Sequence, residues 1–142
     1  MILVVDASVA AKWFFAESGD QWARELAEGE DVLIAPDLIV AEVCNTAWKK
    51  VARAEASADQ ARAVTSALPK IFRELVPCAA LVPQALDLAL ELHHPAYDCF
   101  YLALADLASA DLATADTTLA RKLLRTGFPR SRLRLMGESP AS

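Results

Sequence analysis

The sequence predicts one α/β domain in which a parallel sheet of four or five strands lies between two layers of helices. Short apolar runs, such as those at 2–5 and 112–115, are typical of strands buried on both faces of a parallel sheet. They alternate with longer segments of helical periodicity, as in sheets built from right-handed crossovers. The chain of 142 residues is 55% apolar, which suits one domain with its own core. We expect this domain to cover residues 1–136, followed by a flexible tail at 137–142.

Local signals define the elements of the first half of the chain. Ser8 is a good N-cap for a helix after the first strand, and Gly29 is a good C-cap for the helix before the second strand. In chain order we expect a strand at 2–5, helices at 8–15 and 20–27, a strand at 32–35 and a long helix from Pro36-Asp37 to residue 54.

In the second half, Ser57 and Gln60 have the spacing of a capping box, and we expect Pro69 to kink the helix that they start. In chain order we expect a helix at 57–75, a strand at 76–80, helices at 83–93 and 96–109, a strand at 112–115, a helix at 117–126 and a strand at 132–136. Parallel sheets bind ligands outside the carboxyl ends of their strands, so residues directly after strands are the site candidates.

Three aspartates stand where they can reach that edge. Asp6 follows the first strand, and Asp116 follows the fourth. Asp98 lies in the first turn of an otherwise apolar helix, where a charge is costly unless it is paired or binds a metal. Helix capping and a favourable dipole interaction are the ordinary alternatives for all three.

A fourth carboxylate, Glu42, shares a helix face with Asn45 and Lys49. This face either points into solvent or turns toward the site, with Asn45 helping to hold the Glu42 carboxylate. His93 and His94 end a helix before Pro95, and we expect them to cap its carbonyls rather than to bind metal or act as a base.

Carboxylates that converge need a cation. Two of them at ~4 Å repel by roughly 4 kcal/mol at an effective dielectric constant of 20, and this repulsion raises their pKa values. A hard divalent cation removes the penalty, and ligation by oxygen alone favours Mg²⁺ or Mn²⁺ over zinc. Hydrolysis of a phosphodiester by a metal-activated water is the chemistry that such a site favours.

The net charge of −5 is unlike that of most nucleic-acid binders, but the charge is unevenly distributed. The segment 117–137 contains no acid and six basic residues, namely Arg121, Lys122, Arg125, Arg130, Arg132 and Arg134. This segment is either a solvated helix end followed by a strand with outward arginines, or an edge that contacts phosphates.

The cellular setting follows from what the sequence lacks. No apolar run reaches the ~18 residues of a membrane span, and the N-terminus has no basic region of a signal peptide. The three cysteines, Cys44, Cys78 and Cys99, lie in apolar contexts and are odd in number. We expect them to be buried free thiols in a reducing cytoplasm.

Four sequence blocks resemble the PIN-domain ribonucleases of the VapC toxin type. The blocks are Val4–Phe14, Pro36–Glu42, His94–Ala105 and Ala113–Asp116. They occur in the family's order and span nearly the whole chain. Each block alone is weak, but together they are specific, and they imply a PIN-like fold.

The resemblance implies that four acids form the metal site and carry catalysis. These acids are Asp6, Glu42, Asp98 and Asp116. It further implies Mg²⁺ (or Mn²⁺) as the cofactor, and endonucleolytic cleavage of RNA that leaves 5′-phosphate and 3′-hydroxyl ends.

Neighbouring residues have supporting roles in this interpretation. Ser8 and Thr114 match hydroxyl positions that orient carboxylates or water. Some relatives carry a further acid where Thr117 and Thr118 stand here, so we expect one tightly held ion and a weaker one assisted by substrate. We expect Arg121, Lys122 and Arg125 to contact the RNA backbone.

The resemblance also implies protein partners: a cognate antitoxin that lies in a groove between the early helices and blocks the site, and a second copy in a homodimer. Aromatic residues that can line the groove are Trp13, Phe14, Phe15, Trp22 and Trp48. Ordinary core packing is the alternative for each of these aromatic side chains.

Competing functions are less consistent with the sequence. Haloacid-dehalogenase-type phosphatases need a second aspartate where Ser8 stands, and response-regulator receivers need one after the third strand, where 79–81 has none. No glycine-rich nucleotide-binding motif is present. The alternative from another class is a non-catalytic PIN-fold module that binds RNA or protein, although such a module has no need of four mutually repelling acids.

Overall fold

The structure is a computed structural model, and it describes residues 1–137. Its middle layer is a five-stranded sheet in the order β3-β2-β1-β4-β5. The strands are β1 Ile2–Val5, β2 Val32–Pro36, β3 Glu74–Val76, β4 Asp111–Thr114 and β5 Leu133–Leu135. Every neighbouring pair is parallel, which confirms the predicted fold class.

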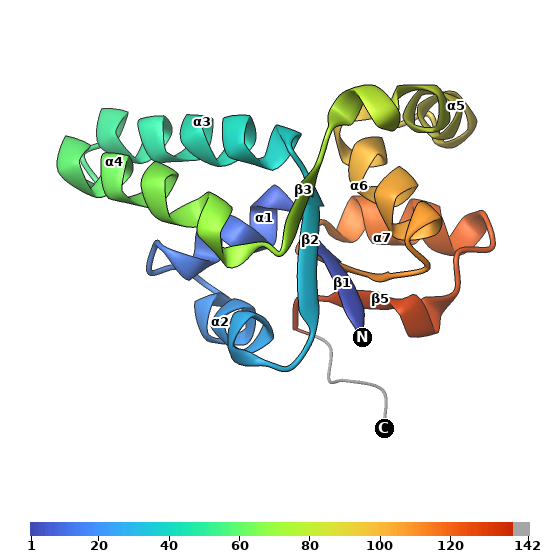
Figure 1. Ribbon diagram of the computed structural model, residues 1–142, viewed down its shortest axis with the longest axis horizontal. Helices are drawn as coiled ribbons and strands as arrows, with labels where there is room; N and C mark the ends of the chain where they lie inside the picture. The colour runs from blue at the N-terminus through green and yellow to red at the C-terminus, as the bar shows by residue number, and fades with distance from the viewer. Residues whose placement is uncertain (138–142) are drawn as a thin grey trace.

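Helices cover both faces of this sheet (Figure 1). They are α1 Ala7–Ala10, α2 Asp20–Glu28, α3 Leu38–Ala52, α4 Ala58–Ala67, α5 Val82–Leu92, α6 Ala96–Leu107 and α7 Thr117–Arg125. Figure 1 shows α1–α4 on one side of the sheet and α5–α7 on the other. The helices change sides because β1 leads outward to β2 and β3, whereas β4 leads the opposite way to β5. The topological switch point, where such sheets bind ligands, therefore lies between β1 and β4.

The core is built on the two central strands and on α6. Leu3, Val4 and Val5 of β1 are fully buried, as are Leu112 and Ala113 of β4. Helix α6 packs against β1, β2 and β4, which explains why its sequence is apolar almost all round. None of the helices within residues 1–137 is both long enough and apolar enough to cross a membrane.

Two prolines account for the main errors in the predicted elements. The helix expected at 57–75 ends at Ala67 and continues as a 3₁₀ turn, Leu68–Ile71. Pro69 ends the helix rather than kinking it, because proline lacks the N–H and its ring clashes with the preceding turn. The strand expected at 76–80 is instead β3, Glu74–Val76, since Pro77 has no N–H to continue the ladder and Cys78–Ala80 forms a 3₁₀ turn.

The remaining elements lie close to their predicted bounds. The helix expected at 8–15 is divided into α1 and a 3₁₀ turn at Ala11–Trp13. The predicted capping box is confirmed, since Ser57 Oγ accepts from the Gln60 N–H and Gln60 Oε1 accepts from the Ser57 N–H. The predicted tail at 137–142 lies outside the described residues from position 138 onward.

Two arginines of the basic segment have structural roles. Arg134 on β5 pairs with Asp111 at 3.0 Å and with Asp31 at 2.6 Å. Arg132 donates to the carbonyl oxygens of Ala105 and Ala110. These bonds fix β5 and the preceding turn against the body of the domain, so both guanidinium groups have partners within the protein.

Candidate active site

Asp6 lies at the end of β1 and is only 5% exposed. Its carboxylate accepts three hydrogen bonds, from Ser8 Oγ at 2.5 Å, from the Val9 N–H at 3.1 Å and from Thr114 Oγ1. Asp6, and not Ser8 as predicted, is therefore the N-cap of α1. Ser8 and Thr114 stand beside the carboxylate, as the resemblance implies.

Burial raises the pKa of Asp6 to about 6. The hydrogen bonds from Ser8, Thr114 and Val9 lower this pKa in part, whereas the charge of Asp98 raises it. The Asp98 carboxylate is therefore close enough to Asp6 to repel it. A buried carboxylate with a raised pKa and a like charge nearby is typical of functional sites.

Glu42 of α3 is half-buried and faces the same region. Its pKa is raised, first by burial and then by the charges of Asp98 and Asp6, while a hydrogen bond from Tyr101 opposes the rise. The Tyr101 hydroxyl donates to Glu42 Oε1 at 3.0 Å. Asn45, the partner expected for Glu42, is exposed, and its side chain forms no hydrogen bond with another residue of the described chain. The carboxylate is thus held by Tyr101 of α6.

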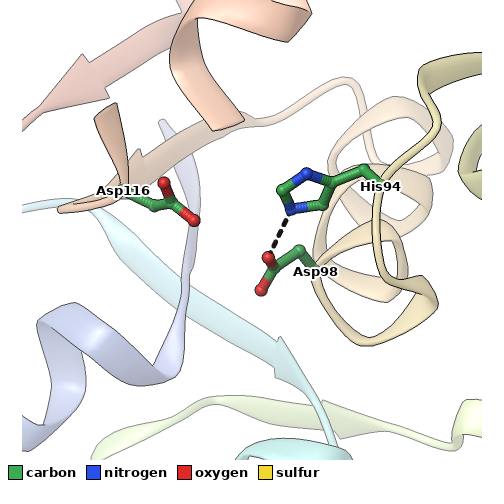
Figure 2. A group of neighbouring side chains, drawn as sticks. All are labelled: His94, Asp98 and Asp116. Atoms are coloured by element: carbon green, nitrogen blue, oxygen red, sulfur yellow. Dashed lines mark hydrogen bonds and ion pairs between the residues drawn. The ribbon is translucent and has the colours of Figure 1, made fainter. Parts of the chain in front are cut away.

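Asp98 and Asp116 approach one another from α6 and α7. Asp98 lies in the first turn of α6. Asp116 is the N-cap of α7, and its Oδ1 accepts from the N–H groups of Thr118 and Leu119, which leaves its other oxygen available. Ligand atoms of His94, Asp98 and Asp116 all lie within 4.8 Å of one another. Figure 2 shows these three side chains facing one another.

His94 belongs to the site, contrary to the expectation that it caps carbonyls. Its Nε2 lies 2.6 Å from Asp98 Oδ2, the contact drawn in Figure 2. The carbonyl of His93 instead accepts from Lys122 Nζ at 3.0 Å, and the same ammonium lies 3.1 Å from His94 Nδ1. Lys122, expected on the RNA backbone, is therefore engaged within the protein.

A shared hydroxyl connects the two aspartates that follow strands. Thr114 Oγ1 accepts from the Asp116 N–H at 3.0 Å and donates to Asp6. Ser8 Oγ similarly accepts from the Ala115 N–H at 3.2 Å while donating to Asp6. The ends of β1 and β4 are thus held together at the switch point by neutral donors.

The four carboxylates form no ion pair with a lysine or arginine of the described chain. Among residues 1–137, the lysine and arginine ion pairs involve other acids, namely Glu17, Asp20, Asp31, Glu55, Asp59 and Asp111. Asp6, Glu42 and Asp116 have no such ion pair with a described residue, and Asp98 contacts only the imidazole of His94. Asp98 and Asp116 thus bring carboxylate oxygens together, and the charge of Asp98 acts on both Asp6 and Glu42. Oxygen ligands of this kind without a counter-ion fit a hard divalent cation.

A surface groove of about 820 Å³ lies beside α4 and the segment that follows α1. Phe14 and Phe15 line it, together with Lys50 and Val64. The three tryptophans of the predicted groove are elsewhere. Trp13 and Trp22 pack against the core, and Trp48 is 64% exposed.

The burial of the cysteines differs from expectation. Cys99 is buried, Cys78 is only half-buried, and Cys44 is exposed on α3. The prediction that all three thiols are buried is therefore wrong for Cys44 and is met in full only at Cys99.

Comparisons with known proteins agree with this architecture. The PIN domain family model matches residues 3–122. Ribonuclease VapC3 from Pyrobaculum aerophilum is 33% identical over 124 residues, which are 86% of this chain and 95% of the relative.

Two solved structures share the fold. A toxin-antitoxin complex from Klebsiella pneumoniae contains a chain with a TM-score of 0.67 and 18% identity, covering 99% of this chain and 98% of that one. The structure of PAE2754 from Pyrobaculum aerophilum has a TM-score of 0.64 and 19% identity, covering 86% of this chain and 79% of that one.

The raised pKa of Asp6 predicts how stability depends on pH in the metal-free protein. Because its pKa is about 6 when folded and about 3.9 when unfolded, the folded state binds more protons between these values. Stability therefore falls as pH rises through that window. Relative to Asp6→Asn, the wild-type free energy of unfolding should fall by about 2 kcal/mol between pH 4 and pH 7. Urea unfolding in EDTA measures this difference, and parallel pH profiles for the two proteins would contradict it.

Proposed function

This chain belongs to the PIN domain family, and we propose that it is a metal-dependent endoribonuclease that acts as the toxin of a toxin–antitoxin pair. The observation that carries the proposal is the acidic edge at the switch point, where Asp98 and Asp116 face one another and the charge of Asp98 raises the pKa values of Asp6 and Glu42. None of these acids forms an ion pair with a lysine or arginine among the described residues. The similarity to Ribonuclease VapC3 over most of both chains supports RNA as the substrate.

The proposed metal ligands are Asp6, Glu42, Asp98 and Asp116. Asp6, Glu42 and Asp116 accept from neutral donors and Asp98 contacts the His94 ring, so the carboxylate oxygens have defined positions before a cation binds. Mg²⁺ or Mn²⁺ in this site would offset the repulsion between the acids and supply a water of lowered pKa for attack on phosphorus. Thr114 bonds to both Asp6 and Asp116 and so fixes their relative position. Tyr101 fixes the carboxylate of Glu42.

Two exposed arginines on α7 are the proposed contacts of the RNA backbone. Arg121 and Arg125 are four residues apart on the helix that begins at Asp116, so they lie on one face. Lys122 is excluded from this role, since its ammonium binds the His93 carbonyl and His94. Phosphate contacts position the RNA without selecting a sequence.

The antitoxin partner is proposed on two grounds. The structural neighbour from Klebsiella pneumoniae is described as a toxin-antitoxin complex. The groove lined by Phe14 and Phe15 also offers Arg24, Lys50 and Glu55, so it can receive an amphipathic segment with charges of both signs. An RNA substrate and free cysteines suit a cytoplasmic location. The homodimer that the resemblance implies stays a prediction.

Asp98→Asn tests the catalytic proposal, because it removes a negative oxygen ligand while keeping the shape of the side chain. We expect Mn²⁺-dependent cleavage of cellular RNA to fall more than about 100-fold. Asp59→Asn is the matched control, since Asp59 also lies in the first turn of a helix but is exposed. Undiminished cleavage by Asp98→Asn would reject the proposed active site, and no metal-dependent cleavage by the purified wild-type protein would favour the non-catalytic binding module.

The pair Arg121→Gln and Arg125→Gln tests the RNA contact. Binding of single-stranded RNA in EDTA should weaken, and the slope of log K against log salt should flatten by about 0.7 for each phosphate that the protein no longer neutralises. Fluorescence anisotropy measures both quantities. The control pair, Arg53→Gln with Arg62→Gln, makes the same charge change on exposed arginines near α4. An equal effect of the control pair on RNA binding would contradict a specific RNA contact by α7 and leave its arginines as ordinary surface residues.

A further inference from the structure

Three side chains from separate segments form a hydrogen-bonded chain that ends at the site. Lys122 Nζ of α7 lies 3.1 Å from His94 Nδ1, and His94 Nε2 lies 2.6 Å from Asp98 Oδ2. The His94 side chain is only 6% exposed. The ring is thus buried between an ammonium on one edge and a carboxylate on the other.

The hydrogen-bond donors in this Lys122–His94–Asp98 series determine which ring nitrogen of His94 carries the proton. A lysine ammonium has three donors and no acceptor, so His94 Nδ1 must accept. A neutral imidazole that accepts at Nδ1 carries its proton on Nε2. Nε2 therefore donates to Asp98 Oδ2, and all the hydrogen bonds run from Lys122 toward the carboxylate.

The backbone beside His94 is held by the same lysine. His93 ends α5 in the left-handed region, with φ of 50°, and its carbonyl accepts from Lys122 Nζ at 3.0 Å. Pro95 follows and begins α6. One ammonium therefore fixes both the corner between α5 and α6 and the ring that projects from it.

Direct ligation of a metal by His94 is the alternative, because its ring atoms lie within 4.8 Å of carboxylate oxygens of Asp98 and Asp116. A ligating Nε2 needs a free lone pair, which places the proton on Nδ1. That proton would then face the N–H groups of Lys122 at 3.1 Å. Two donors would oppose each other, so the geometry disfavours His94 as a ligand.

We propose that Lys122 and His94 are positioning residues that fix the Asp98 carboxylate, with one oxygen held by His94 and the other left for the cation. This inference rests on the proposed metal site. It assigns Lys122 to the support of Asp98 rather than to RNA, and it leaves the ligand set composed of oxygen alone, which favours Mg²⁺ or Mn²⁺.

The first measurement needs no variant: long-range ¹H–¹⁵N spectra of the histidine rings in the metal-free protein. We expect His94 to carry its proton on Nε2, and Lys122→Met to remove this preference. His93→Asn identifies the other histidine signal, and asparagine tolerates the left-handed backbone there. A proton on Nδ1 of wild-type His94, alone or together with one on Nε2, would overturn the proposal.

The second measurement is the affinity for Mn²⁺ by calorimetry. His94→Leu should bind Mn²⁺ about 10- to 100-fold more weakly. His94→Gln should stay near wild type, because its amide N–H reaches the place of Nε2, and His93→Asn should be unchanged. Wild-type affinity in His94→Leu, or an equally weakened affinity in His94→Leu and His94→Gln, would overturn the positioning role. If the wild-type protein binds no Mn²⁺, the proposed function itself fails, and the ring spectra still decide whether the Lys122–His94 chain exists.

Discussion

Like charges held close together at the carboxyl edge of the sheet are the constraint on which the site depends. Burial and mutual repulsion raise the pKa values of Asp6 and Glu42. Neutral donors hold three of the acids: Ser8 and Thr114 donate to Asp6, Tyr101 donates to Glu42, and backbone N–H groups donate to Asp116, while Asp98 contacts the imidazole of His94. Neutral donors orient carboxylates but leave their charge uncompensated. Elsewhere in the described chain, acids such as Asp111 pair directly with arginine. The contrast explains why this edge suits a cation and the opposite end of the sheet does not.

The architecture was largely predictable because its signals are local. Apolar runs mark the buried central strands, and the capping box marks the start of α4. The error at β3 has a physical cause, since this short edge strand is only partly buried and lacks the apolar run of a central strand. Pro69 and Pro77 mark the ends of α4 and β3. A proline in a sequence indicates a break in regular structure, but it does not specify whether the element kinks or stops there.

A site residue was predictable from the sequence only where its position relative to a strand or helix identifies it. Asp6 and Asp116 follow strands, and Asp98 stands out in an apolar helix, whereas Glu42 needed the family resemblance. Tyr101 contacts Glu42 across 59 residues of sequence, and Lys122 contacts His94 across 28. No local pattern contains such pairings. The spacing of four between His94 and Asp98 was a usable signal, although Pro95 between them favoured the interpretation of His94 as the end of a helix.

An anomalous difference map from crystals soaked in Mn²⁺ tests the central claim most directly, because it locates the ion without reference to activity. We predict a peak surrounded by carboxylate oxygens of four residues, Asp6, Glu42, Asp98 and Asp116, with His94 still bonded to Asp98 and outside the ligand set. An empty acidic pocket at millimolar Mn²⁺, or a peak coordinated by the His94 ring, would contradict it.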